Sequence, residues 1–325
     1  MALEALKSMA RCLVASCVLL EAMSANAGDF PTHALRLVSA ASAGSASDII
    51  GRMIANELAA ALGVPVYLEN KPGASGLIAI NTLLAAPPDG YTVYISTSSH
   101  TVNPVISKVP YDPVRDFVGV TPLAVVPNIL VVGEKSKFRS VKDIVDAAKA
   151  EPGKLNYASV GVGTATYMNA EKFRVAAGIS ATHIPFKGSM EAMTETISGR
   201  VDYFFAPLVS AFPLVKEGRL KALAVGTNKR LALLPNVPTM AEAGVANADY
   251  LFWIGMLVPA KTPRATIAKL NQAAKRALEA RQVREQLEHL GAEPYSMSAE
   301  DFDARIKAEL DTNAKLVKSA GIKTD

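Results

Sequence analysis

In the first third of the chain, short continuous apolar runs alternate with segments whose apolar residues recur at helical spacing. Short apolar runs at Leu35–Ser39, Val64–Leu68 and Thr92–Ser96 are typical of buried strands. Between the first two runs, Ser47 is expected to start a helix and Gly63 to end it. One face of this helix is apolar, at Ile50, Met53, Ile54, Leu58 and Leu62. A further helix before the third run completes a β-α-β-α-β order, which predicts a parallel sheet covered on both faces.

The middle of the chain repeats this order, and the last third is mainly helical. Ser140-Val-Lys-Asp143 has the form of a capping box and predicts a helix start. Further strands are predicted at 128–132, 155–159, 182–186, 201–205, 222–225 and 250–258. The segments after them have helical patterns, at 263–281, 283–290 and 298–320. The fold class is therefore α/β, with a purely helical C-terminal part.

The chain is long enough for two domains, because one compact core rarely exceeds about 250–300 residues. We expect the chain to cross between two lobes near Leu123–Asn128 and Asp249–Gly255. Two crossings make the first lobe discontinuous. Lobe 1 is predicted to comprise residues 28–127 plus 255–325, and lobe 2 residues 128–254.

Four loops rich in glycine and hydroxyl groups follow predicted strands and start helices. They are 42–48, 96–99, 161–164 and 187–189. A helix start carries unpaired backbone N–H groups and a partial positive charge. Small residues let a ligand approach these groups, so four such loops in an alternating strand and helix order indicate a binding site for a small anion, most simply a carboxylate.

Composition excludes several classes of function. The chain has 325 residues, of which 50% are hydrophobic and 20% charged, and its net charge of +4 is scattered rather than clustered. This argues for a globular protein and against nucleic-acid binding. The four histidines lack metal-ligand spacing, so no metal is expected. Gly161-Val-Gly163 lacks the third glycine of a dinucleotide fingerprint, and no cofactor is expected.

The N-terminus has the order of a secretory signal peptide, predicted to comprise residues 1–27. Lys7 and Arg11 precede a short apolar stretch, and Ala25-Asn-Ala27 is a cleavage site of the A-x-A type. The mature chain would start near Gly28 in the periplasm, without cysteine, because Cys12 and Cys17 precede the cut. Val14-Ala-Ser-Cys17 resembles a lipoprotein cleavage box, but it follows Arg11 too closely to leave a proper apolar stretch.

Two further residues have both a structural and a functional interpretation. Asp48 can simply complement the helix dipole, or it can orient the amides of the first loop. Trp253 can be a core residue, or it can form a wall of the cleft, since it lies on a predicted crossing. Lys187 is interpreted as a solvated surface cation, and His183 as a packed core histidine.

The order of motifs resembles the Bug family, the extracytoplasmic solute receptors associated with tripartite tricarboxylate transporters. The matching stretches cover essentially the whole mature chain in the family's order, and include Glu69–Gly76, Pro88–Thr92, Asn103-Pro104, Pro110–Phe117, Lys154–Ser159, Phe186–Ser189, Lys221–Val225, Leu234–Thr239, Glu242–Gly244 and Pro259–Pro263. The resemblance implies a type II periplasmic-binding-protein fold, with two α/β lobes that close on a small carboxylate.

Three positions depart from the family pattern. Gly44-Ser45 stands where the family usually has two glycines, Tyr167 where it has a histidine, and Ala206 where it often has an aspartate. Tyr167 and Ala206 would make the cleft less polar, which would favour an aromatic or longer apolar acid. With these positions carried over from the family, the predicted ligand-binding residues are Ser42, Gly44, Ser45, Asp48, Ser98, Ser99, Gly161, Gly163, Thr164, Tyr167, Gly188, Ser189, Ala206 and Trp253.

The leading hypothesis is a non-enzymatic, monomeric receptor that delivers a small carboxylate to membrane permease subunits. One alternative keeps the fold but has the receptor act as a ligand sensor for a membrane histidine kinase. Another is a periplasmic serine hydrolase, for which His100 is the only candidate base near a cleft serine. The sequence does not name the carboxylate.

Overall fold

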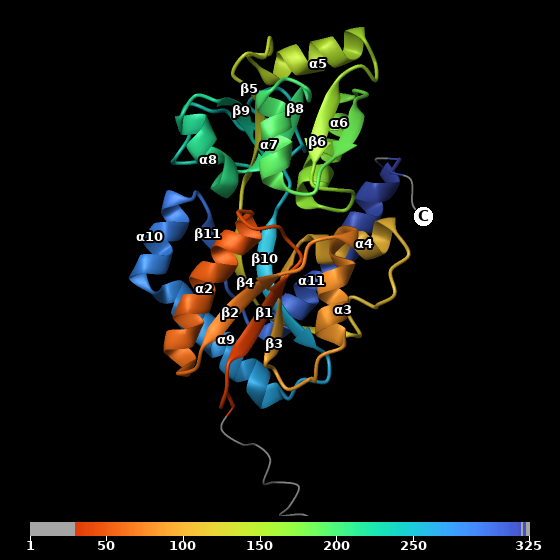
Figure 1. The fold of residues 1–325 in the computed structure, drawn as a ribbon. Coiled ribbons are helices and arrows are strands. Elements are labelled where there is room, and N and C mark those ends of the chain that lie inside the picture. The colour runs from red at the N-terminus through yellow and green to blue at the C-terminus, as the bar shows by residue number, and fades with distance from the viewer. Residues whose placement is uncertain (1–29, 320, 323–325) are drawn as a thin grey trace, which may run out of the picture. The chain divides into compact units, whose positions relative to one another are not determined.

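The computed structural model describes residues 30–319, 321 and 322, so the predicted signal peptide, Cys12 and Cys17 lie outside the described residues. The chain from Ala34 onward forms one compact unit. Within this unit the strands form two separate sheets, each covered by helices (Figure 1). None of the described helices is both long and apolar enough to cross a membrane.

The first sheet has six strands in the order β11-β4-β10-β3-β1-β2. Its strands are β1 (Leu35–Ser39), β2 (Val66–Asn70), β3 (Thr92–Thr97), β4 (Phe117–Val125), β10 (Trp253–Pro259) and β11 (Glu293–Pro294). As predicted, β1 is parallel to β2 and β3. The sheet is nevertheless mixed rather than wholly parallel, because β10 returns antiparallel between β3 and β4.

The second sheet has five strands in the order β7-β6-β8-β5-β9. Its strands are β5 (Asn128–Gly133), β6 (Asn156–Ser159), β7 (Thr182–Pro185), β8 (Tyr203–Pro207) and β9 (Leu220–Val225). β6 is parallel to β7 and β8, whereas β5 is antiparallel to β8 and β9. We call the elements around the first sheet the first lobe and those around the second sheet the second lobe; the exact lobe boundaries stay a prediction.

Helices from both ends of the chain cover the first sheet. The first lobe contains η1 (Ala74–Gly76), α2 (Ala46–Leu62), α3 (Leu77–Leu84), α4 (Ser99–Ile106), α9 (Arg264–Glu279), α10 (Arg281–His289) and α11 (Ala299–Ser319). The second lobe contains α5 (Val141–Ala150), α6 (Ala165–Ala177), α7 (Ser189–Ile197) and α8 (Leu208–Lys216). α9 packs on α2 and β4, and α11 packs on α4 and β4. Strand β4 and helix α8 were not predicted from the sequence.

Local sequence signals explain where several helices begin and end. Ser140 and Asp143 form the expected capping box of α5, and Gly63 ends α2 in the left-handed conformation. The start of α2 differs from the prediction, because Ser45 rather than Ser47 is the cap and its hydroxyl accepts a hydrogen bond from the Asp48 amide. Thr164 caps α6 in the same way.

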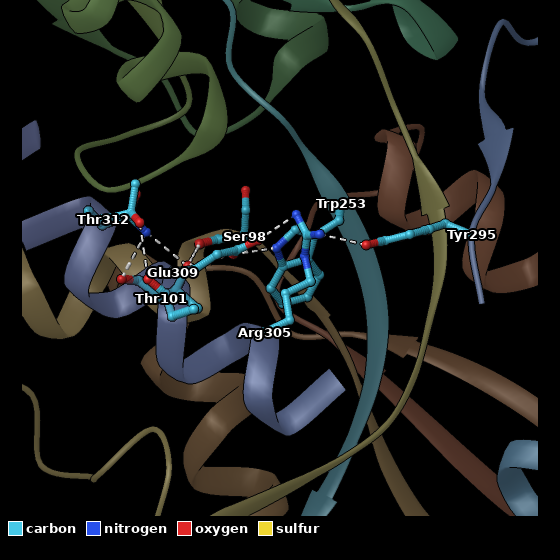
Figure 2. Close-up of polar contacts among 9 residues, drawn as sticks. Ser98, Thr101, Trp253, Tyr295, Arg305, Glu309 and Thr312 are labelled. Carbon is cyan, nitrogen blue, oxygen red and sulfur yellow. Dashed lines mark hydrogen bonds and ion pairs between the residues drawn. The ribbon is translucent and has the colours of Figure 1, made fainter. Parts of the chain in front are cut away.

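A polar network under β10 joins the crossing strand to the C-terminal helix (Figure 2). Glu309 of α11 accepts hydrogen bonds from the Trp253 indole (2.7 Å) and from the Thr101 hydroxyl of α4 (3.3 Å). The other Glu309 oxygen pairs with Arg305, which also donates to the Tyr295 hydroxyl at 2.6 Å. Trp253 is fully buried, so its indole N–H depends on this carboxylate for a partner.

Replacing Glu309 with alanine should therefore lower the free energy of unfolding by about 1–3 kcal/mol, the usual cost of leaving a buried donor unsatisfied. Asp311→Ala, an equal change of charge at an exposed position of the same helix, should change it little. Urea unfolding followed by the fluorescence of Trp253, the single tryptophan, measures both. Equal stability of the two variants would contradict the role assigned to Glu309.

Candidate functional site

A cavity of about 700 Å³ is lined by residues of both lobes. This volume lies within the range of small-molecule sites. The starts of α2, α4, α6 and α7 all contribute to its wall. Seven of the predicted ligand-binding residues line the cavity: Ser42, Ser45, Ser99, Gly161, Thr164, Gly188 and Ser189.

The other seven predicted residues are not in the cavity wall: Gly44, Asp48, Ser98, Gly163, Tyr167, Ala206 and Trp253. Ala206 is fully buried in the core of the second lobe, and Trp253 packs edge-to-face on Phe302. Tyr167 packs against the His183 ring. The structure therefore places these three side chains in packing positions, because their strand or helix faces turn them toward the interior.

Asp48 orders the first loop instead of facing the cavity. One carboxylate oxygen accepts a hydrogen bond from the Gly44 amide, and the other accepts one from Arg52 Nε, each at 2.9 Å. Arg52 also donates to Asn70, whose side chain in turn donates to the Ala41 carbonyl. Burial alone would raise the pKa of Asp48, but the Gly44 amide and Arg52 outweigh it and lower the pKa below its usual value. Asp48 thus stays ionised and fixes the loop.

The loop before α6 is ordered by its own hydroxyl groups. Thr164 Oγ1 donates to the Gly161 carbonyl at 2.7 Å and accepts the Tyr167 amide. Ser159 Oγ accepts the Gly161 amide at 3.0 Å and lies 2.6 Å from His183 Nε2. These contacts leave the first N–H groups of α6 available for a ligand, because a helix does not pair them itself.

Two contacts bring the lobes together beside the cavity. The Ser42 hydroxyl donates to the Lys187 carbonyl at 3.2 Å, and the Ser210 hydroxyl donates to the Gly44 carbonyl at 3.4 Å. A Cβ atom added to Gly188 would lie 3.2 Å from Ser42 Oγ. The loops on the two sides therefore approach as closely as their small residues allow.

Gly163 makes a second close approach between the lobes. A Cβ atom at this position would collide with Oδ1 of Asn103 in α4. Gly163 was predicted to bind the ligand; in the structure its lack of a side chain makes room for Asn103, and its contact with a ligand stays a prediction. Asn103 itself lines the cavity, and the signal that could have found it was the Asn103-Pro104 motif.

His100 is a buried, neutral residue of the cavity wall. Its Nε2 lies 2.9 Å from the Pro113 carbonyl and donates to it, and its ring contacts Tyr111 and Phe117. Burial lowers the pKa of His100 to about 4. His100 was the candidate base for a serine nucleophile, but its hydrogen bond goes to a backbone carbonyl.

The serine and histidine that do lie close together are Ser159 and His183. Ser159 is fully buried and does not line the cavity, so it is not accessible to a substrate there. Within the described residues, no group of histidine, cysteine or acidic side chains is arranged to bind a metal ion. Sequence reasoning also missed the apolar wall residues Ile80, Tyr94 and Phe252, which carry no motif.

Comparison with known proteins identifies this architecture. The model of the tripartite tricarboxylate transporter family receptor matches residues 50–322. The chain belongs to this family. The receptor is 33% identical over 290 residues to the UPF0065 protein in the tcbD-tcbE intergenic region of Pseudomonas sp. (strain P51). The aligned region covers 89% of this chain and 86% of that protein.

Solved structures agree with this assignment. The structure of R. palustris Rpa4515 with adipate has a TM-score of 0.87 at 32% identity and covers 90% of the receptor and 99% of that chain. The structure of the periplasmic binding protein BugD has a TM-score of 0.86 at 28% identity, and the match covers 91% of the receptor and 100% of the BugD chain. The resemblance to Bug receptors and the two-lobed solute-binding fold are thus both confirmed.

The buried neutral state of His100 has a consequence for pH. Because its folded pKa of about 4 lies below the ordinary value of 6.5, the unfolded chain binds a proton more readily between these values. Stability should therefore fall as pH drops from about 6.5 toward 4. Urea unfolding at pH 7, 6 and 5 measures this. The free energy of unfolding should fall less with decreasing pH in His100→Gln than in the wild type. The exposed control His289→Gln should keep the wild-type slope; an unchanged slope in His100→Gln would contradict this.

Proposed function

We propose that the protein is an extracytoplasmic receptor that captures a small carboxylate between its lobes. The observation that carries this is the convergence of the α2, α4, α6 and α7 starts on one cavity. Backbone N–H groups and hydroxyls there would bind the anion, partly through water. The relative from R. palustris contains adipate, which supports a carboxylate as the class of ligand.

Ligand binding would stabilise the arrangement in which the lobes touch. Ser42 and Lys187 meet at one contact, and Gly163 and Asn103 at another. A ligand bridging the α2 and α6 loops has higher affinity for this arrangement than for one with separated lobes. Only such a difference in affinity can shift the equilibrium between them.

We infer that the closed receptor acts in the periplasm and delivers its ligand to membrane permease subunits of a tripartite tricarboxylate transporter. The family description supports this partner, and the predicted signal peptide supports the location. The role is binding rather than catalysis, since the buried Ser159–His183 pair is outside the cavity.

A thermal-shift screen of mono-, di- and aromatic carboxylates tests the receptor function. A ligand at a hundred times its dissociation constant adds about 2.7 kcal/mol to the free energy of unfolding and raises the melting temperature. Neutral amides of the same acids should have no effect. If amides stabilise as well as acids, the cavity does not select for a carboxylate.

Gly163→Ala should weaken binding of a stabilising carboxylate by about tenfold or more, because the new methyl group collides with Asn103 where the lobes meet. The matched control is Gly178→Ala, since Gly178 also has a positive φ but has open space around it. Titration calorimetry measures both variants. Equal affinities would show that the contact between Gly163 and Asn103 does not contribute to binding.

A further inference from the structure

The cavity wall contains both polar and apolar groups. The second lobe contributes the loops at the starts of α6 and α7. The first lobe contributes hydroxyl groups, among them those of Ser42, Ser45 and Ser99. It also contributes Ala40, Gly76, Ile80 and Tyr94, which we call the apolar recess. A Cβ atom on Gly76 would lie 3.4 Å from Ala40 Cβ and 3.6 Å from the Tyr94 hydroxyl, so these residues adjoin one another. Ala40, Ile80 and Tyr94 also pack in one hydrophobic cluster.

The helix starts around the cavity differ in charge. Asp48 places a carboxylate at the start of α2, where it accepts the Gly44 amide. Glu191 does the same at α7, where it accepts the Lys187 amide at 3.0 Å. The first turns of α4 and α6 have no acidic residue. A ligand carboxylate is therefore favoured by the α6 start without repulsion from a neighbouring side chain.

A second ligand carboxylate would find no buried cation. Among the described residues that line the cavity, Lys187 is the one with a charge at neutral pH, and its side chain is exposed. An exposed ion pair contributes little, because water and salt screen it. In the apolar recess, a carboxylate would lose its water without a charged partner, which is costly. Burial also raises the pKa of Tyr94, so this ring stays neutral.

We propose that the ligand is an acid with a single carboxylate and an apolar body. The carboxylate binds at the α6 start and the body lies in the apolar recess. This deepens the proposed receptor function and depends on it. The sequence suggested an apolar ligand from Tyr167 and Ala206, which are outside the cavity wall; the recess supports the same class from different residues.

Titration calorimetry on the wild-type chain from residue 28 tests this with pairs of acids matched in length. The pairs are hexanoate with adipate, octanoate with suberate, and benzoate with terephthalate. Each monocarboxylate should bind at least about tenfold more tightly than its partner. Affinity should also rise about fourfold per methylene from hexanoate to octanoate, as burial of apolar surface requires.

A pair of variants on α3 tests the recess. Ile80→Thr places a hydroxyl in the recess and should weaken octanoate binding about tenfold. It should also weaken the binding of benzoate and terephthalate. Ile78→Thr makes the same change at a position that is 48% exposed and should bind like the wild type. The melting temperature of each unliganded variant shows whether it is folded.

The outcomes separate the two proposals. If adipate and suberate bind as tightly as hexanoate and octanoate, or more tightly, the single-carboxylate inference is overturned while the receptor function stands. If Ile78→Thr and Ile80→Thr lose affinity equally, the recess does not bind the ligand body. If none of the six acids binds the wild type, the single-carboxylate inference is overturned, and the wider thermal-shift screen decides whether the carboxylate receptor stands.

Discussion

Every helix start leaves backbone N–H groups that its own hydrogen bonds cannot satisfy, and the site depends on where these groups lie. In this protein, helices from the two lobes, each built on its own sheet, begin around one cavity. Asp48 and Glu191 place carboxylates at two of them, whereas the α4 and α6 starts have no acidic residue, and the α6 start is our proposed site for the ligand anion. The close approach of Gly163 to Asn103 then brings the α6 loop against the first lobe. Binding and contact between the lobes therefore involve the same segment.

Much of the fold could be predicted from periodicity and helix signals alone. Most strands and helices lie within a few residues of the predicted ranges, and the Ser140–Asp143 capping box has the expected geometry. The mixed first sheet could not be predicted, because the direction in which β10 enters depends on a tertiary pairing with β3 and β4. Ser45 and Ser47 are equally good caps by residue type, so only backbone geometry distinguished them.

The site was predictable at the level of loops but not of every side chain. Loops rich in glycine and hydroxyl groups indicated the cavity, because their residue types reveal where backbone can approach a ligand. Trp253 and Ala206 are fully buried, and the sequence did not show which face of its strand each side chain would occupy. The apolar recess has no local signature, because Ala40, Ile80 and Tyr94 come together only through packing.

A crystal structure of the receptor grown with octanoate would show where the carboxylate and the alkyl chain of the ligand bind. We expect the carboxylate within about 2.7–3.2 Å of backbone N–H groups between Gly161 and Thr166, the range of N–H···O hydrogen bonds, or within hydrogen-bond distance of the hydroxyls there. The alkyl chain should contact Ile80 and Tyr94. A carboxylate bound instead at Lys187, with the alkyl chain away from the recess, would contradict this expectation.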